Sequence, residues 1–376
     1  MNILVLHSSS DLYGASQVLL NVIKSLIEKG DNPIVILSEN GPLTEKLTDL
    51  GAEVKIIRLG ILRRKYLSPR GLLNRINVIR QAQRELKQLI SERKIEIVYS
   101  HTTAVLVGAL VAKQAGIKHI WHVLEITTRP WFFVKVTGFL LNNLSATIIA
   151  ASNAVKEHWN QFTSRDKIIR IYNGINLRPF EEKSGAIKAE LHLHESCILI
   201  GMIGRVHYWK GQDYFLRIAG ELSRTNPDIY FVMVGDAFPG YEYLYSKLEK
   251  IVEEEKIADR VFNLGYRTDI VNILNSLDIF VLPSVLPDPF PTVVLEAMAA
   301  AKPVVATKQG GAVEMIEDGV SGVLIPLNDA ALSAKKMIEI IKDSEKRLRM
   351  GENAYKRVIT EFSITAFNNA IVEVFR

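Results

Sequence analysis

The stretch "CILIGMIGRVHYWKGQDYFLRIA", residues 197–219, predicts a strand, a loop and a helix in direct succession. A short apolar run leads into a loop that begins at Gly204, and a helical pattern follows from about Gln212. A strand that runs into a glycine-containing loop and then a helix is the repeating unit of parallel, doubly wound sheets. This stretch therefore predicts an α/β fold.

The same unit recurs along the chain in two series. The first begins at "NILVLHSS" and the second at residue 197, and the polar stretch 177–196 between them shows no clear strand. We expect two Rossmann-like domains facing a central cleft, residues 1–178 and 179–355, and a C-terminal helix in 356–376 that packs back on the first domain. Ligands of such sheets bind beyond the carboxyl ends of the strands, so the loops there are the candidate sites.

The composition fits a globular protein of this size. A chain of 376 residues with 48% hydrophobic and 23% charged residues is too long for one ordinary core. The single cysteine, Cys197, permits no internal disulfide and favours a reducing compartment. The N-terminus lacks the basic region of a signal peptide, and no stretch reaches the roughly 18 uncharged apolar residues of a membrane span. We expect a cytoplasmic protein.

Two cations stand in the loop of the opening stretch. Arg205 follows Gly204, and Lys210 immediately precedes the predicted helix. A forked guanidinium, an ammonium group and the N–H groups of a helix N-terminus together suit a diphosphate. The alternative is a solvated loop with ordinary surface cations. The pattern is neither a Walker loop nor a dinucleotide fingerprint.

Two carboxylates lie in "PSVLPDPFPTVVLEAM", residues 283–298. Prolines hold Asp288 outside the helix that begins at about Thr292, whereas Glu296 lies in the first turns of that helix. A carboxylate can accept both hydroxyl groups of a vicinal diol such as ribose, which suits Glu296. The alternatives are a favourable helix-dipole position for Glu296 and an ordinary turn residue at Asp288.

Together, "GRVHYWKG", "YNGINLRPF" and "PSVLPDPFPTVVLEAMAAAKPVVAT" with "GGAVEMIEDGVSG" resemble family 4 glycosyltransferases. These are retaining, nucleotide-sugar-dependent enzymes with the GT-B fold, and the resemblance covers nearly the whole chain. It implies that Arg205 and Lys210, beside Gly204, bind the donor diphosphate and stabilise the leaving group. It also implies that Glu296 holds the ribose hydroxyl groups.

The chain departs from the family pattern at two positions. The family has a pair of glutamates spaced eight residues apart, and Asp288 replaces the first; Pro291 replaces a glycine. We expect Asp288 to orient a sugar hydroxyl. The backbone N–H of Phe290 can still reach the sugar, whereas Pro291 has no N–H to offer. The next residue, Thr292, also belongs to the expected donor site.

Four further residues enter the site through the resemblance. Gly14 occupies the second place of the N-terminal glycine loop, and His122, at a strand end, would lie beside the transferred sugar. Tyr266 and Arg267 would frame the nucleobase, largely through backbone groups. The alternatives are an ordinary strand–helix turn for Gly14 and a structural role for a lone strand histidine.

The resemblance implies a retaining transferase that moves a hexose, with glucose as the simplest choice, from a UDP-sugar. The acceptor would be a hydroxyl of a lipid-linked saccharide or oligosaccharide in cell-surface polysaccharide or glycolipid synthesis. No residue suggests a nucleophile and no Asp-x-Asp motif is present, so we expect neither a metal nor another cofactor. A GDP-sugar-dependent mannosyltransferase and a non-catalytic nucleotide-sugar or lipid-binding protein remain alternatives. An epimerase, a glycan phosphorylase or a nucleic-acid reader lacks support in the motifs.

The positive charge lies in the first half of the chain. The net charge is +11 up to Arg178 and −6 beyond it, for a total of +5. The stretch 61–90 has cations at 63, 64, 65, 70, 75, 80, 84 and 87 beside Leu73, Ile76, Ile79 and Leu86, and the stretch 130–144 carries Trp131, Phe132, Phe133, Phe139 and Leu140. A basic helix beside an aromatic one suits peripheral contact with an anionic membrane at its inner face. The alternative places the aromatic side chains in the core.

Overall fold

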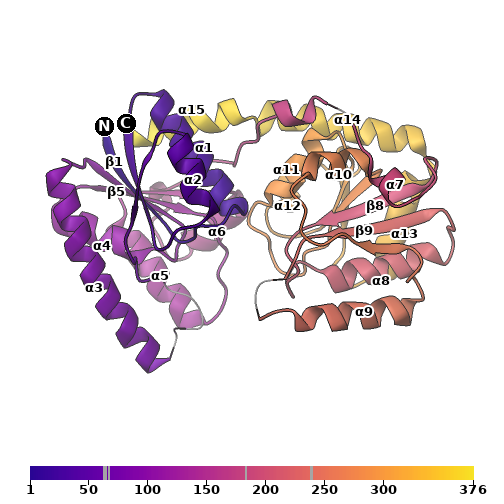
Figure 1. The fold of residues 1–376 in the computed structure, drawn as a ribbon, viewed down its shortest axis with the longest axis horizontal. Helices are drawn as coiled ribbons and strands as arrows, with labels where there is room; N and C mark the ends of the chain where they lie inside the picture. Colours follow the sequence, from indigo (N-terminus) through magenta and orange to yellow (C-terminus); the bar gives the residue numbers. More distant parts are fainter. Residues whose placement is uncertain (62–65, 67, 183, 238–239) are drawn as a thin grey trace. The chain divides into compact units, whose positions relative to one another are not determined.

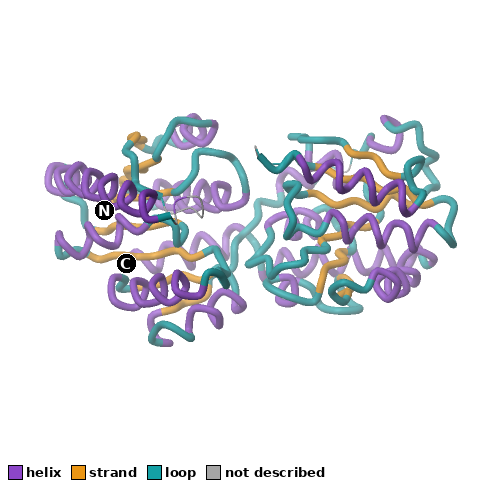
Figure 2. The backbone as a smooth tube through the Cα atoms, turned by 90° about the horizontal axis from the view of Figure 1, so that it is seen from below, coloured by secondary structure: helices purple, strands orange, loops and turns teal. Residues whose placement is uncertain are grey.

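The computed structural model describes residues 1–376 apart from 62–65, 67, 183 and 238–239 (Figure 1). The chain forms two compact units: the first comprises Met1–Gly174 and Ile364–Arg376, and the second comprises Ile175–Ser363. Each unit contains its own parallel sheet with helices on both faces (Figure 2). The predicted α/β fold with two doubly wound parallel sheets is confirmed.

The sheet of the first unit has seven parallel strands in the order β3-β2-β1-β4-β5-β6-β7. The strand order reverses at β1, so the loops after β1 and β4 diverge at the carboxyl edge, where doubly wound sheets bind ligands. The strands are β1 (Asn2–His7), β2 (Asn32–Leu37), β3 (Glu53–Ile56), β4 (Ile97–His101), β5 (Lys118–Val123), β6 (Thr147–Ala150) and β7 (Ile168–Arg170).

Alternate side chains of these strands enter cores on opposite faces. Ile3 and Val5 of β1 pack with α1, α2 and α15, whereas Leu4 and Leu6 pack with α3 and α4. A further apolar cluster contains residues of α4, α5 and α6. The helices are α1 (Gly14–Glu28), α2 (Pro42–Asp49), α3 (Pro69–Glu92), α4 (Leu106–Ala115), α5 (Trp131–Leu144), α6 (Asn153–Asn160) and α15 (Ile364–Phe375).

The sheet of the second unit has six parallel strands in the order β10-β9-β8-β11-β12-β13. The strand order reverses at β8, which places the loops after β8 and β11 at the equivalent edge. The strands are β8 (Ile198–Ile203), β9 (Ile229–Val234), β10 (Val261–Asn263), β11 (Ile279–Leu282), β12 (Val304–Thr307) and β13 (Gly322–Ile325).

The helices of the second unit cover its sheet on both sides. An apolar core lies under α8, α9 and α13, and it includes Phe215, Phe231 and Met337. On the other side, α11 packs against α10, α12 and α14. The helices are α7 (Ile187–Glu190), α8 (Gln212–Ser223), α9 (Tyr243–Glu255), α10 (Ile270–Ser276), α11 (Thr292–Ala299), α12 (Ala312–Met315), α13 (Ala330–Lys342) and α14 (Ser344–Glu361).

Candidate active site

The loop after β8 is held against the end of β11 by a glycine. Gly211 has φ +79°, and a Cβ atom there would lie 2.0 Å from the carbonyl oxygen of Pro283. Only glycine tolerates both conditions, because other residues are strained at positive φ and would overlap Pro283. This contact brings Lys210, the residue before it, to the loop that carries Asp288. Helix α8 begins at Gln212, as the sequence predicted.

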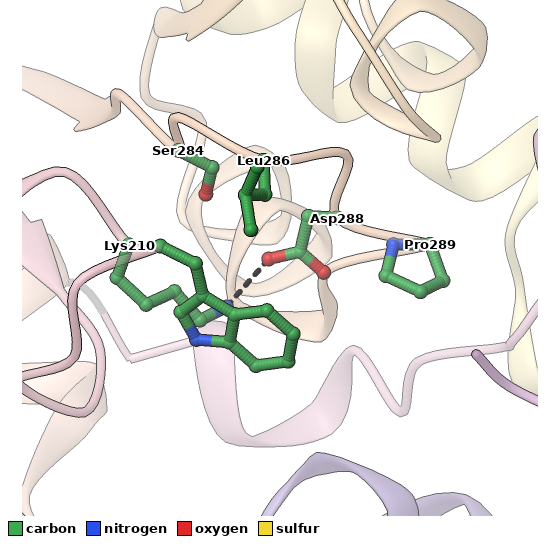
Figure 3. A pocket seen from close by; sticks show the side chains of 6 residues that line it. Lys210, Ser284, Leu286, Asp288 and Pro289 are labelled. Carbon is green, nitrogen blue, oxygen red and sulfur yellow. Dashed lines mark hydrogen bonds and ion pairs between the residues drawn. The ribbon is translucent and has the colours of Figure 1, made fainter. Parts of the chain in front are cut away.

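The Lys210 ammonium group and the Asp288 carboxylate form an ion pair with an Nζ–Oδ2 distance of 2.5 Å (Figure 3). Both side chains are mostly buried, so this pair is screened less than a surface pair. The pair had no counterpart in the sequence-based prediction, which assigned Lys210 to the diphosphate and Asp288 to the sugar. A small pocket surrounds the pair, and its other lining residues are Trp209, Ser284, Leu286 and Pro289.

Two adjacent glycines after β12 lie against the backbone of the loop that carries Asp288. A Cβ atom on Gly310 would lie 2.4 Å from the carbonyl oxygen of Asp288, and one on Gly311 would lie 2.1 Å from that of Pro289. The N–H of Gly311 also donates to the Asp288 carbonyl at 2.8 Å. The sequence analysis gave these glycines no role. Their adjacency just after a strand was the available signal.

Glu296 lies in the fifth position of α11, whose first residue is Thr292 and whose N-cap is Pro291. Burial raises the pKa of the Glu296 carboxyl to about 7. In the part of the chain that the structure describes, this carboxyl has no hydrogen-bond or ion-pair partner. A partly buried carboxyl without a partner is costly unless a ligand satisfies it, so Glu296 is the strongest single candidate for a ligand contact.

The other predicted donor residues differ in how they are held. The carbonyl of Arg205 accepts a hydrogen bond from the Gln212 side chain at 2.9 Å, which ties the loop to α8. Arg267 donates to both Glu190 and Asp269, so its guanidinium is engaged within the protein. Tyr266 is 58% exposed. The nucleobase contact of Tyr266 and Arg267 stays a prediction.

Phe290 and Gly204 have structural contacts of their own. The Phe290 ring is buried and packs edge-on against Phe362 at a centroid distance of 5.6 Å. The N–H of Gly204 donates to the Val234 carbonyl at 2.8 Å, and a Cβ atom on Gly204 would have open space apart from Lys210. Packing therefore does not require a glycine at position 204, and its donor-site role stays a prediction.

In the first unit, three histidines lie side by side at the carboxyl edge of the sheet. The register pairs His7 with His101 and His101 with His122 across β1, β4 and β5. Nδ1 of His7 lies 3.0 Å from Nδ1 of His101, and Nδ1 of His122 lies 2.6 Å from the Tyr99 hydroxyl. Nε2 of His122 is buried and has no hydrogen-bond partner in the described residues.

Burial keeps these rings neutral. It lowers the pKa of His7 to about 4 and that of His122 to about 3, and it lowers the pKa of His101 well below its ordinary value. Phe375 of α15 packs against Tyr99 beside them. The predicted site residue Gly14 begins α1, at the same edge of the sheet and directly after the exposed Tyr13.

Glu125, in the loop after β5, was missed by the sequence analysis. Burial raises its pKa to about 7, although the N–H groups of Thr103 and Leu124 donate to its carboxylate and favour the charged form. A lone glutamate after a strand that also carries His122 was the available signal. Within the described ranges, no cluster of three or more histidine, cysteine or acidic side chains is suited to hold a metal ion.

Three of the four aromatic side chains of α5 are exposed rather than part of the core, and Phe133 is half-buried. Trp131, Phe132 and Phe139 are 61%, 60% and 64% exposed, and the opposite side of α5 is buried. Leu73 and Ile76 of α3 are exposed as well, whereas Leu86 is buried. Both helices pack against α4. The cations at positions 63, 64 and 65 lie outside the described residues.

None of the helices within the described ranges combines the length and the apolar character that membrane crossing requires. The exposed apolar side chains of α3 and α5 therefore belong to short or amphipathic helices.

Two family models together match most of the chain. The model described as Glycosyltransferase Family 4 matches residues 13–178, and the model described as Glycosyl transferases group 1 matches residues 184–357. The two matches correspond to the two series of strands and helices.

Curated relatives and a solved structure are similar over nearly their full lengths. The UDP-Gal:alpha-D-GlcNAc-diphosphoundecaprenol alpha-1,3-galactosyltransferase of Escherichia coli is 26% identical over 97% of this chain and 94% of its own. The N,N'-diacetylbacillosaminyl-diphospho-undecaprenol alpha-1,3-N-acetylgalactosaminyltransferase of Campylobacter jejuni is 27% identical over 93% and 91%. The Anabaena protein HepE in complex with UDP-glucose is 25% identical, covers 100% of this chain and 99% of its own, and has a TM-score of 0.86. The chain therefore belongs to the family 4, group 1 glycosyltransferases and has the GT-B fold.

Proposed function

We propose that the protein transfers a hexose, with glucose as the first choice, from a UDP-sugar to a hydroxyl of a lipid-linked saccharide or oligosaccharide, with retention of the anomeric configuration. The product would enter cell-surface polysaccharide or glycolipid synthesis. The observation that carries the proposal is that cations and a buried carboxyl both lie at the strand ends of the second unit. Arg205 and Lys210 suit a diphosphate, and the unpartnered carboxyl of Glu296 suits a ribose diol.

The comparisons support the substrate classes of this proposal. The similarity to a structure solved with UDP-glucose supports a uridine donor and glucose. The E. coli and C. jejuni relatives, named for diphosphate-linked undecaprenol acceptors, support a lipid-linked acceptor. Their names differ in the transferred sugar, so UDP-galactose and its N-acetylated form are the donors to test beside UDP-glucose.

In the proposed reaction, the bond between the anomeric carbon and the diphosphate oxygen breaks, and the acceptor oxygen bonds to that carbon on the same face. Negative charge develops on the leaving phosphate. Arg205 and Lys210 would neutralise that charge, and the acceptor hydroxyl would pass its proton to the same phosphate. The Lys210 ammonium has three N–H donors, so it can contact the phosphate while it keeps Asp288. Asp288 would orient Lys210 through the ion pair and would also orient a sugar hydroxyl.

His122 would contribute from the first unit. Its Nδ1 is fixed by Tyr99, and its Nε2 has no partner in the described residues, so one ring nitrogen remains available for the transferred sugar. The contact of His122 with the sugar and the role of the Gly14 loop stay predictions.

Calorimetric titration with UDP, GDP, ADP and dTDP, without metal, tests the donor class. We expect UDP to bind and Glu296→Ala and Arg205→Ala each to weaken its binding. Preferential binding of GDP would favour the mannosyltransferase alternative instead. UDP binding without transfer from any UDP-sugar to alkyl-diphosphate-linked saccharides would favour the non-catalytic alternative.

We also propose that the first unit contacts an anionic membrane at its inner face through α3 and α5. The exposed ring of Trp131 with its neighbours would enter the interface, and the cations of α3 would attract anionic lipid. Trp131→Ser with Phe132→Ser should reduce co-sedimentation with phosphatidylglycerol vesicles. Leu348→Ser, which changes an exposed apolar residue of α14, is the matched control. Equal binding of all three proteins would contradict the contact.

A further inference from the structure

The loop after β5 holds Glu125 by both its backbone and its side chain. One carboxylate oxygen accepts from the Thr103 N–H at 3.2 Å, and the other accepts from Thr103 at 3.1 Å and from Leu124 at 3.2 Å. The Glu125 carbonyl accepts from the Trp159 indole at 2.9 Å. Thr103 and Leu124 thus hold the carboxyl group, and Trp159 of α6 holds the backbone, before any ligand arrives.

The carboxyl of Glu125 is not accounted for by a structural ion pair. None of the ion pairs among the described residues includes it, and its donors are N–H groups and the Thr103 hydroxyl. An ionised carboxylate offers about four lone-pair positions, and the N–H donors leave part of them open. Because burial and N–H donors act in opposite directions, the carboxyl changes charge near pH 7. Such groups concentrate at functional sites.

The neighbouring residue Thr102 shows two further signs of a built site. Its φ is +83°, which is rare for a β-branched residue. Its N–H donates to the His122 carbonyl at 2.9 Å, and its carbonyl accepts from the Trp121 indole at 2.8 Å. These two hydrogen bonds hold Thr102 in this conformation. The Thr102 hydroxyl is buried and has no partner in the described residues. Buried polar atoms rarely stay unsatisfied, so the Thr102 hydroxyl keeps unused hydrogen-bonding capacity next to Thr103, which donates to Glu125.

The chain around Glu125 also fits the shape of an amphiphilic acceptor. Helix α5, with its exposed aromatic side chains, begins at Trp131, six positions after Glu125. A lipid-linked saccharide has an apolar part suited to that helix and hydroxyl groups suited to a carboxylate. The two features follow one another on a single short loop of the first unit.

We propose that Glu125, together with the hydroxyl of Thr102, binds a hydroxyl group of the acceptor saccharide. The inference rests on the proposed function, because it takes the acceptor to be a saccharide, but it concerns the first unit only. The carboxylate accepts a hydrogen bond from the sugar hydroxyl and thereby orients the acceptor; no covalent step is assigned to it.

The test uses octyl glucoside, octyl galactoside and octyl N-acetylglucosaminide, below their micellar concentrations, as acceptor probes. Saturation-transfer NMR titrations compare the wild type with Glu125→Gln and with Glu157→Gln, which changes an exposed glutamate of the same unit. We expect Glu125→Gln to weaken binding of at least one probe about tenfold, since a hydrogen bond to a charged group contributes about 1.5–3 kcal/mol. Glu157→Gln should leave it unchanged.

A pH profile separates this role from a merely structural one. Because Glu296 also titrates near pH 7, the profile is measured in the Glu296→Gln background without nucleotide. Probe binding should strengthen as the pH rises through about 7 and should become flat when Glu125→Gln is added. If Glu125→Gln does not fold, the pH dependence of probe binding by Glu296→Gln alone still tests the proposal.

Equal probe binding by the wild type and Glu125→Gln, a flat profile in the background protein, or no binding of any probe by the wild type would overturn the proposal. UDP titration of Glu125→Gln distinguishes this failure from failure of the proposed function. Loss of acceptor binding with intact UDP binding supports the assignment, whereas a wild type that binds no UDP contradicts the donor site and leaves the probe measurements to decide on Glu125.

Discussion

At the carboxyl edges of the two sheets, the same strand–loop–helix geometry carries different chemistry. In the first unit, His7, His101 and His122 lie side by side, buried and neutral, and satisfy much of their hydrogen-bonding capacity among themselves and with Tyr99. In the second unit, Lys210 and Asp288 form an ion pair and line a small pocket. The comparison teaches that the same backbone geometry places an ion pair at one edge and buried, neutral rings at the other. In the proposed function, the ion-pair edge would meet the anionic donor and the neutral edge would meet the acceptor saccharide.

The largest effect that would sharpen this comparison is an acid-induced loss of stability confined to the first unit. An unfolded histidine is protonated below about pH 6.5, but burial holds His7 neutral down to about 4 and His119 and His122 down to about 3. The stabilising free energy is complete above pH 6.5 and is lost as the pH falls, by up to about 2 kcal/mol per ring at pH 5.

Two carboxyl groups act in the opposite direction. Glu125 and Glu296 have pKa values raised to about 7, so each favours its folded unit as the pH falls through 7. In the first unit the buried histidines outweigh Glu125, whereas the second unit gains from Glu296. The variant Trp209→Phe leaves tryptophans only in the first unit, so its fluorescence in urea at pH 7.5 and 5.0 reports that unit. An unfolding midpoint that does not fall at pH 5.0 would break the comparison.

The next effect concerns the charges of the second unit. Lys210→Ala should lower the rate of sugar transfer about 100-fold or more, because in the proposed reaction it removes a cation that would neutralise the charge on the leaving phosphate. It also leaves Asp288 without its ion-pair partner. Initial rates with UDP-glucose measure the loss. Lys247→Ala, which breaks an exposed ion pair with Asp213 in the same unit, should retain the wild-type rate.

Gly211→Ala tests whether the cation loop depends on its packing. The new Cβ atom would overlap the Pro283 carbonyl at positive φ, so we expect a loss of about 2 kcal/mol or more in the stability of the second unit. Gly319→Ala is the matched control, since Gly319 has φ +80° but open space around its Cβ position. Thermal unfolding of both variants separates overlap from backbone strain. Equal losses would show that the contact with Pro283 does not matter.

The smallest effect is the pH dependence of donor binding. In the proposed donor site, ionised Glu296 would accept two hydroxyl hydrogen bonds and the protonated form would accept less well, so affinity for UDP-glucose should rise as the pH increases through about 7. Glu296→Gln should weaken binding about tenfold at pH 8, since it removes a charge-assisted hydrogen bond, and should flatten the profile. UDP-glucose is used because both its phosphates keep one charge over this range. Glu249→Gln, on the exposed side of α9, is the control. A slope that persists in Glu296→Gln would assign the pH dependence to another group.

Much of this was readable from the chain alone. The alternation of short apolar runs and helical patterns predicted two parallel sheets, because buried strands and amphipathic helices have different hydrophobic periods. Local signals predicted the start of α8 at Gln212 and the position of Glu296 in the first turns of α11. A glycine precedes α8, and a proline precedes α11. Arg205, Lys210 and Glu296 could be named for the same reason: each lies at the boundary of a recognisable element.

The remaining features depend on contacts between residues far apart in the chain. The Lys210–Asp288 pair joins residues 78 positions apart, and Gly310 and Gly311 matter because the Asp288 loop lies against them. The shifted pKa values of Glu125 and Glu296 come from burial, which no local pattern reveals. Periodicity along the chain specifies which elements form, whereas the charge, burial and available hydrogen bonds of a side chain are set by whatever the fold places beside it.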